Sequence, residues 1–177
     1  MGTIQSKPII DPKIDHIQGN LNAPLVLLEY GDYECPYCQD AYGVIKSLQN
    51  HFGPQLCFVF RNFPLSEIHL HAELAAEAAE AAGLQNKFWE MYDCLFENQD
   101  SLEKPDLIKL AKKIGLKHKQ FKRDLEAGAC QSRVERDLLL GLKEDVNGTP
   151  TFFINGILYN GSYKLLDQAL QVILNTL

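Results

Sequence analysis

The chain lacks any long apolar run, and none of its 177 residues belongs to a stretch near the roughly 18 that a membrane-spanning helix needs. It also lacks a basic excess, because 17 Lys and Arg residues stand against 23 Asp and Glu and give a net charge of −6. Phosphate groups repel an acidic protein. Composition therefore argues against a nucleic-acid partner and against a membrane-embedded protein.

An apolar leader is missing from the start of the sequence. Residues 1–15 are polar and contain proline, unlike the hydrophobic stretch of a secretory signal. We interpret residues 1–14 as an N-terminal tail. As it stands, the sequence predicts a cytoplasmic protein. A periplasmic or other extracytoplasmic location is the alternative, if a signal was removed.

Cysteine is scarce, and the five residues present cannot all pair within one chain. Only Cys35 and Cys38 lie close together. The disulfide framework of a small secreted protein is denser and even-numbered. The count instead favours one redox-active pair and three other thiols, which lie at positions 57, 94 and 130.

The first half of the chain reads as a strand, a helix and a second strand. An apolar stretch at residues 25–30 predicts a buried strand, and residues 56–62 are rich in aromatic and β-branched side chains. Between them a helical pattern covers residues 36–52 and ends at Gly53 and Pro54. A strand, a crossover helix and a strand make a βαβ unit, whose strands pair in parallel.

The remainder of the chain has a helical block followed by a hairpin. Strands are predicted at residues 151–154 and 157–159, with an Asn-Gly turn between them, and an amphipathic helix covers residues 163–174. The preceding helices are expected at about 72–82, 87–97, 105–114, 120–125 and 130–144.

This order predicts two domains. Residues 1–62 and 147–177 form an α/β domain, and residues 63–146 form a helical domain inserted between its halves.

The sequence Cys35-Pro36-Tyr37-Cys38 follows a predicted strand and opens a helix. The N-terminus of a helix presents unpaired N–H groups and a partial positive charge, which stabilise a thiolate. Pro36 suits the first helical position because its φ is preset and it has no N–H group. Cys35 is therefore the expected nucleophile, exposed and with a lowered pKa. Cys38, one turn later, can resolve a mixed disulfide.

Half of a structural zinc site is the alternative interpretation of this motif. Such a site needs two cysteine pairs, and the sequence has no second pair. We therefore predict redox chemistry with no metal and no cofactor.

Two segments carry a family resemblance. Glu-Tyr-Gly-Asp-Tyr-Glu-Cys-Pro-Tyr-Cys at residues 29–38 and Gly-Thr-Pro-Thr-Phe-Phe-Ile-Asn-Gly at residues 148–156 resemble the DsbA-like branch of the thioredoxin superfamily. The resemblance spans residues 15–177. It implies an α/β thioredoxin fold with an inserted helical domain. It also implies a thiol–disulfide oxidoreductase that exchanges disulfides with substrate proteins, served by a redox partner protein or glutathione.

The resemblance also assigns roles to residues. Cys35 resembles the family's nucleophile and Cys38 its resolving cysteine. Pro150, after Thr149, resembles the cis-proline that lies against the cysteine pair and presents backbone groups to a substrate peptide. Together with Pro36 and Tyr37 between the cysteines, these two residues are the expected substrate-binding residues.

Glu29 is a lone carboxylate in an otherwise apolar strand, six residues before Cys35. A buried acid has a raised pKa and can relay a proton to or from Cys38. The family has an acidic residue with this proposed role at the corresponding place. The alternative is that strand alternation turns Glu29 toward solvent.

Tyr37 is a departure from DsbA itself, which has a histidine between its cysteines. Tyrosine adds no positive charge, so we expect a less acidic Cys35 and a less oxidising disulfide. Pro-Tyr also occurs in glutaredoxins, which are reductases, so the direction of electron flow stays open. The alternatives are a glutathione-linked reductase and a non-enzymatic binding module for an iron–sulfur cluster or a client peptide.

The remaining cysteines and two histidines receive simpler interpretations. Cys57 and Cys94 lie among apolar residues and are expected in the core. Cys130 lies near a helix start, which favours some reactivity, and a disulfide between Cys94 and Cys130 is an alternative. His69 and His71 precede an alanine-rich helix and are expected to be surface or capping residues, without a metal.

Overall fold

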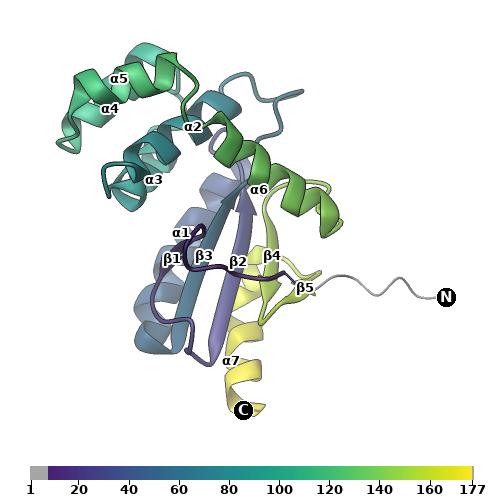
Figure 1. Ribbon diagram of the computed structural model, residues 1–177. Coiled ribbons are helices and arrows are strands. Elements are labelled where there is room, and N and C mark those ends of the chain that lie inside the picture. Colours follow the sequence, from purple (N-terminus) through teal and green to yellow (C-terminus); the bar gives the residue numbers. More distant parts are fainter. Residues whose placement is uncertain (1–7, 177) are drawn as a thin grey trace.

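The computed structural model describes residues 8–176, in which five strands form one sheet with the order β1-β3-β2-β4-β5. Its two central strands are β2 (Leu25–Gly31) and β3 (Leu56–Asn62), which pair in parallel and are joined by α1 (Pro36–Phe52) (Figure 1). The short 3-10 turn η1 (Gly53–Gln55) follows α1. The predicted βαβ unit is confirmed.

Successive side chains along the two central strands point to opposite faces of the sheet, and each face has its own cluster of buried side chains. Leu27 and Phe58 belong to one cluster of buried side chains, whereas their neighbours Leu28 and Val59 belong to a second cluster. Both faces of these strands are therefore covered. This explains why their sequences are almost continuously apolar.

The C-terminal part completes the sheet with an antiparallel hairpin. Strand β4 (Thr151–Ile154) pairs with β2, and β5 (Ile157–Tyr159) pairs with β4. At the turn, Asn155 has a φ of 50° and Gly156 a φ of 78°, the left-handed conformations that two-residue hairpins require. The predicted terminal helix begins as a 3-10 turn, η2 (Tyr163–Leu165), and continues as α7, which covers Leu166–Thr176.

Strand β1 (His16–Gln18) is absent from the prediction. It pairs antiparallel with β3, with His16 opposite Phe60. Three residues with one apolar side chain carry no strand pattern, so the strand exists because the edge of β3 offers hydrogen bonds. Prediction from local pattern misses such an element.

The helical block lies between β3 and β4 in the chain. Figure 1 shows most of it beyond the end of the sheet where β2 finishes and α1 begins. Its buried residues form one continuous cluster with those of the sheet, including Leu27, Ala79 and Phe121. The two parts thus share a core, and their division into domains stays a prediction. The helices are α2 (Ala72–Gly83), α3 (Phe88–Glu97), α4 (Lys104–Lys113), α5 (His118–Glu126) and α6 (Gln131–Lys143).

A buried polar network joins the helical block to the sheet. The carboxylate of Glu80 on α2 accepts hydrogen bonds from His16 Nε2 and Asn62 Nδ2, each at 2.8 Å, and from Arg133 Nε at 2.7 Å. Burial favours the neutral acid, but the hydrogen bond from His16 and the charge of Arg133 hold the pKa of Glu80 below its usual value. The carboxylate therefore fixes β1, β3, α2 and α6 together.

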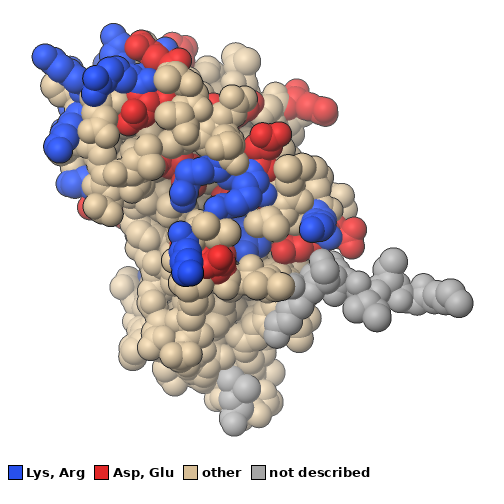
Figure 2. Space-filling model, in the orientation of Figure 1, with Lys and Arg blue, Asp and Glu red and all other residues tan. Residues whose placement is uncertain are grey.

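Charge is unevenly distributed over the surface. Eight of the 17 Lys and Arg residues lie within residues 104–123, the segment of α4 and α5. Figure 2 shows these basic side chains gathered at one end of the molecule, while the lower part of the same face shows few charges. The net charge of −6 thus conceals a basic cluster on the helical block.

Candidate active site

The cysteine motif lies where β2 ends and α1 begins. Cys35 is the N-cap residue of α1, with extended dihedrals of −75° and 121°, and Pro36 takes the first helical position. The carbonyl oxygen of Cys35 accepts the N–H groups of Cys38 at 3.0 Å and of Gln39 at 3.1 Å, which start the helix. The structure thus places the motif at a helix N-terminus, as its sequence predicts.

The prediction that Cys35 is exposed is wrong. Only 3% of the residue is accessible to solvent. The reason is a segment distant in sequence: the loop before Pro150 lies over Cys35, and the carbonyl oxygen of Thr149 is 3.5 Å from Cys35 Sγ, where the neutral thiol can donate to it. A partner therefore reaches the sulfur at the junction between α1 and this loop.

The two thiols differ sharply in acidity. The pKa of Cys35 is lowered to about 5, chiefly by a hydrogen bond from Cys38, with further help from the backbone N–H groups of Cys38 and Tyr37. Complete burial raises the pKa of Cys38 well above its usual value. Its sulfur also accepts the N–H group of Asp32 at 3.5 Å. At neutral pH Cys35 is therefore a thiolate and Cys38 a thiol.

Glu29 lies inside the sheet and not in solvent. It is 0% exposed and stands between Phe60 of β3 and Phe152 of β4 in the strand register. Neither carboxylate oxygen has a hydrogen-bond partner among the described residues. Burial raises the pKa of Glu29 to about 8, with a contribution from the charge of Cys35. Its own charge in turn helps to raise the pKa of Cys38, after the larger effect of burial.

The loop opposite the cysteines has the expected cis-proline. The peptide bond between Thr149 and Pro150 is cis, and the carbonyl of Thr149 faces the Cys35 thiol. Next to it, the Thr151 hydroxyl donates to the carbonyl oxygen of Gly148 at 2.7 Å and holds the loop.

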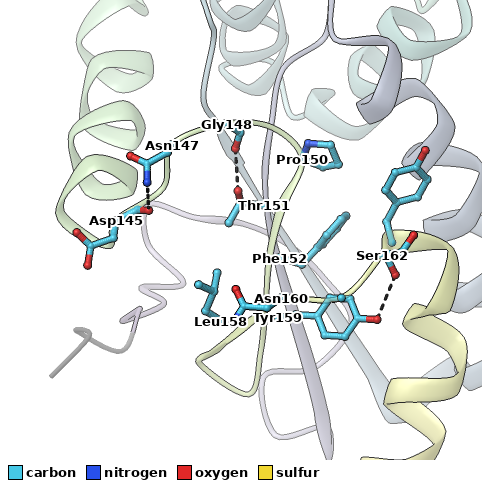
Figure 3. A pocket seen from close by; sticks show the side chains of 12 residues that line it. Asp145, Asn147, Gly148, Pro150, Thr151, Phe152, Leu158, Tyr159, Asn160 and Ser162 are labelled. Atoms are coloured by element: carbon cyan, nitrogen blue, oxygen red, sulfur yellow. Dashed lines mark hydrogen bonds between the residues drawn. The ribbon is translucent and has the colours of Figure 1, made fainter. Parts of the chain in front are cut away.

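A cleft of about 370 Å³ opens beside this loop. Figure 3 shows Pro150 and Phe152 on one side of it, with Tyr159 below and the η2 segment opposite. The Tyr159 hydroxyl donates to the carbonyl oxygen of Ser162 at 3.1 Å. Tyr163 at the rim donates to Asp40 of α1 at 3.2 Å. Tyr163 therefore joins the rim of the cleft to the helix that carries the cysteines.

His71 is the N-cap residue of α2, as expected, although its side chain makes no capping hydrogen bond. Both histidines are partly exposed, and their side chains pair with acidic residues, which the sequence did not predict. His69 Nδ1 lies 2.8 Å from the carboxylate of Asp32, and His71 Nδ1 lies 2.8 Å from the carboxylate of Glu34. Asp32 and Glu34 precede the nucleophile by three and one positions. The partners are 37 residues apart in the chain, so no local pattern could have paired them.

The other three cysteines have no part in this site. They are free and buried. Burial raises the pKa of Cys57 and Cys94, and raises that of Cys130 to about 11. The expectation that Cys130 is reactive is therefore wrong, because burial and the charge of Glu80 outweigh the helix start. Cys94 and Cys130 do not form the alternative disulfide.

Among residues 8–176, no three His, Cys, Asp or Glu side chains converge as metal ligands do. Within the same residues, no helix is both long and apolar enough to cross a bilayer.

The sheet order, the cysteine pair at the start of α1 and the cis-proline opposite define a thioredoxin fold with a helical insertion. In agreement, a family model described as Thioredoxin matches residues 12–172. The chain therefore belongs to this thioredoxin family.

Solved structures with a similar fold show which branch of this family the chain resembles. BdbD from Bacillus subtilis, in its oxidised form, has a TM-score of 0.81 at 26% identity, over 93% of this chain and 95% of that one. A thioredoxin-like oxidoreductase from Silicibacter pomeroyi has a TM-score of 0.78 at 28% identity, covering 91% and 92%. Alpha-DsbA1 from Wolbachia pipientis shares the fold at 19% identity, with a TM-score of 0.79 over 95% and 94%. The predicted fold, the DsbA-like resemblance and the oxidoreductase class are confirmed.

Curated relatives are closer in sequence but much longer. A protein named Na(+)/H(+) antiporter NhaA 1 from Mycolicibacterium vanbaalenii is 44% identical over 156 residues, which are 87% of this chain and 25% of the relative. A protein of the same name from Mycobacterium sp. (strain KMS) is 46% identical with the same coverage. The chain thus spans about a quarter of the length of the curated relatives that it matches.

Proposed function

We propose that this chain exchanges disulfide bonds with substrate proteins, with Cys35 as the nucleophile and Cys38 as the resolving thiol. The observation that carries the proposal is the placement of both thiols in the first turn of α1, with Cys35 Sγ 3.5 Å from the carbonyl oxygen of Thr149 before the cis-proline. The lowered pKa of Cys35 supplies a nucleophilic thiolate at neutral pH. The raised pKa of Cys38 keeps the second thiol in reserve until the first bond has formed.

In the reducing direction, the Cys35 thiolate attacks one sulfur of a substrate disulfide. The substrate S–S bond breaks, its second sulfur leaves as a thiolate, and Cys35 is joined to the substrate. Cys38 then loses its proton and attacks Cys35 Sγ, which releases the remaining substrate sulfur. Two electrons pass to the substrate, whose two thiolates take up the proton released by Cys38 and one proton from solvent, and a Cys35–Cys38 disulfide remains. Oxidation of a substrate dithiol is the same sequence in reverse.

Glu29 is the proton acceptor that we propose for Cys38. Its pKa of about 8 lies near neutrality, so it can both take a proton and return it. Once Cys35 is joined to a substrate, its thiolate charge is gone. Glu29 then ionises more readily, because that charge contributes to its raised pKa. The carboxylate thus becomes available at the step that needs it.

The substrate peptide belongs, in this proposal, between the cis-proline loop and the turn of the motif. Backbone groups at Thr149 and Pro150 lie beside the reactive thiol, and the cleft beside Pro150 offers room for a side chain. On the other side, Tyr37 is 63% exposed next to Pro36. A flexible chain that contains a cysteine fits this arrangement better than a folded surface, because the thiol is recessed.

The direction of exchange depends on the compartment and on the redox partner. Stabilisation of the Cys35 thiolate favours the reduced form of the pair and so makes its disulfide a better oxidant. In an extracytoplasmic compartment the pair would oxidise substrate thiols and be reoxidised by a partner protein. In the cytoplasm, glutathione or a partner protein would keep it reduced, and it would act as a reductase.

Trapping of mixed disulfides tests the assigned roles. Cys38→Ser should accumulate covalent complexes with a protein substrate that contains a disulfide, because attack by Cys35 survives and resolution does not. Cys35→Ser should trap none. Non-reducing electrophoresis followed by mass spectrometry identifies the joined cysteine. Complexes formed through Cys38 in Cys35→Ser, with none in Cys38→Ser, would reverse the assignment.

A further inference from the structure

Gln99, in the turn after α3, contacts the active-site loop from the helical block. Its side-chain amide nitrogen donates to the carbonyl oxygen of Tyr33 and to the carbonyl oxygen of Cys35, each at 2.9 Å. One acceptor lies two residues before the nucleophile, and the other belongs to the nucleophile itself. A single side chain therefore holds the peptide groups on both sides of Glu34 and Cys35.

The Cys35 carbonyl is also where helix α1 starts. It accepts the N–H groups of Cys38 at 3.0 Å and of Gln39 at 3.1 Å. The N–H groups of Tyr37 and Cys38 in this same turn help to lower the pKa of the Cys35 thiol. The orientation of the carbonyl and that of the stabilising N–H groups are therefore linked through one turn of backbone.

From this geometry we propose that Gln99 is a positioning residue for the nucleophile, which holds the Cys35 carbonyl so that the first turn of α1 stabilises the thiolate. Gln99 does not contact the sulfur, so its action is indirect. The inference rests on the proposed function and adds to its site a residue from the helical block.

The chemistry of the side chain fits this role. A neutral amide can direct both of its N–H bonds at carbonyl oxygens, which need donors. A carboxylate of the same shape would face two carbonyls without a proton to give, and would add negative charge near the thiolate. Gln99→Glu is therefore the sharpest substitution, and Gln99→Ala removes the donor alone.

Gln39 supplies a matched control. Its side-chain amide donates to the carbonyl oxygen of Phe96 at 3.0 Å and so also joins α1 to α3. That bond does not involve a carbonyl of the Tyr33–Cys35 segment. Gln39→Ala should thus loosen the same two helices without disturbing the turn at the nucleophile.

Two readouts decide the proposal, namely the pKa of Cys35 from ultraviolet thiolate absorbance against pH, and the equilibrium with glutathione. In that equilibrium one oxidised glutathione takes two electrons from the dithiol, giving the Cys35–Cys38 disulfide and two reduced glutathiones. Gln99→Ala should raise the pKa of Cys35 and shift the equilibrium toward the protein disulfide by about 3–10-fold. Gln99→Glu should shift both further, and Gln39→Ala neither.

Equal shifts in the Gln99 and Gln39 variants, or no shift in the Gln99 variants, would overturn the positioning role. Because Gln99→Glu keeps the size of the side chain, this variant provides the test if Gln99→Ala does not fold. A wild-type pair that forms no disulfide with glutathione would instead contradict the proposed function, and the comparison of thiol pKa values would still decide the role of Gln99.

Discussion

The acidity of Cys35 shows how a neutral environment can replace a charged neighbour. Tyr37 stands where DsbA has a histidine, and the sequence therefore predicted a less acidic thiol. The structure gives a pKa of about 5, because the Cys38 thiol and backbone N–H groups stabilise the thiolate. The position of the motif at a helix start predicted the backbone N–H groups, whereas the larger effect, the hydrogen bond from Cys38, was not predicted.

This acidity predicts a pH dependence of stability. The folded pKa of Cys35, about 5, lies below that of a free thiol, about 8.5. The thiolate therefore contributes stability that is complete above about pH 8.5 and is lost as pH falls through about 5. The difference in thermal stability between the reduced wild type and Cys35→Ser should therefore grow as pH rises from about 5 to about 8.5, because the opposing contribution of Glu29 is present in both proteins. A difference that stays constant across this range would contradict the lowered pKa of Cys35.

A second prediction concerns Glu29 and the rate at which Cys38 resolves a mixed disulfide. The rate of resolution by Cys38 should rise with pH in the wild type as Glu29 ionises, with a midpoint below about 8 because the mixed disulfide lacks the Cys35 charge, and Glu29→Gln should be slower and lose this rise. The release of substrate thiol from a preformed mixed disulfide with Cys35 measures this step. Equal rates across the pH range would remove Glu29 from the mechanism.

A stability measurement is the control for that variant. The folded pKa of Glu29 is raised from 4.5 to about 8, so ionisation of the unfolded chain destabilises the fold increasingly between these values. Glu29→Gln has no charge to bury. It should gain stability relative to the wild type as pH rises from 4.5 to about 8.

At the scale of secondary-structure elements, Glu80 on α2 joins the helical block to the sheet through three hydrogen bonds. Glu80→Ala leaves three buried or half-buried donors without their acceptor and should lower the free energy of unfolding by about 2–4 kcal/mol. Glu73→Ala, an exposed position on the same helix, is the matched control and should change little. Urea unfolding compares the two, and similar losses would show that the network contributes nothing specific.

The pKa of Glu80 determines how the loss of unfolding free energy in Glu80→Ala depends on pH. It is held below the usual value of 4.5, so its contribution is present above that value and is lost as pH falls further. The difference between wild type and Glu80→Ala should therefore shrink in acid. A constant difference would mean that the carboxylate is not ionised in the folded protein.

Elements with a strong local signal were predictable. The central strands have continuous apolar runs, α1 has a proline at its start, and the hairpin has Asn155-Gly156, so their bounds agree closely with the structure. Strand β1 has no such signal. Its existence depends on the edge of β3, which lies some 40 residues away in the chain.

The site was predictable only in part for the same reason. The motif and the cis-proline were visible in sequence, whereas the contacts of His69, His71 and Gln99 with the active-site loop arise from packing of the helical block. The burial of Cys35 likewise depends on a loop more than a hundred positions away.

At the scale of the whole molecule, the helical block and the sheet meet at the loop that carries the nucleophile. They share a core, and residues of the block contact the loop that carries the nucleophile. A thioredoxin-like sheet alone would lack the hydrogen bonds from Gln99 and the two histidines. The insertion is therefore part of the active-site environment as well as a cover for it.

The reduction potential of the Cys35–Cys38 pair tests the central claim most directly. It is obtained by equilibrating the protein with glutathione mixtures and counting free thiols by alkylation and mass spectrometry. An acidic nucleophile without a histidine beside it predicts a reversible disulfide with a potential between those of thioredoxin, about −270 mV, and DsbA, about −120 mV. A pair that forms no reversible disulfide, or one with a potential below that of thioredoxin, would contradict the account.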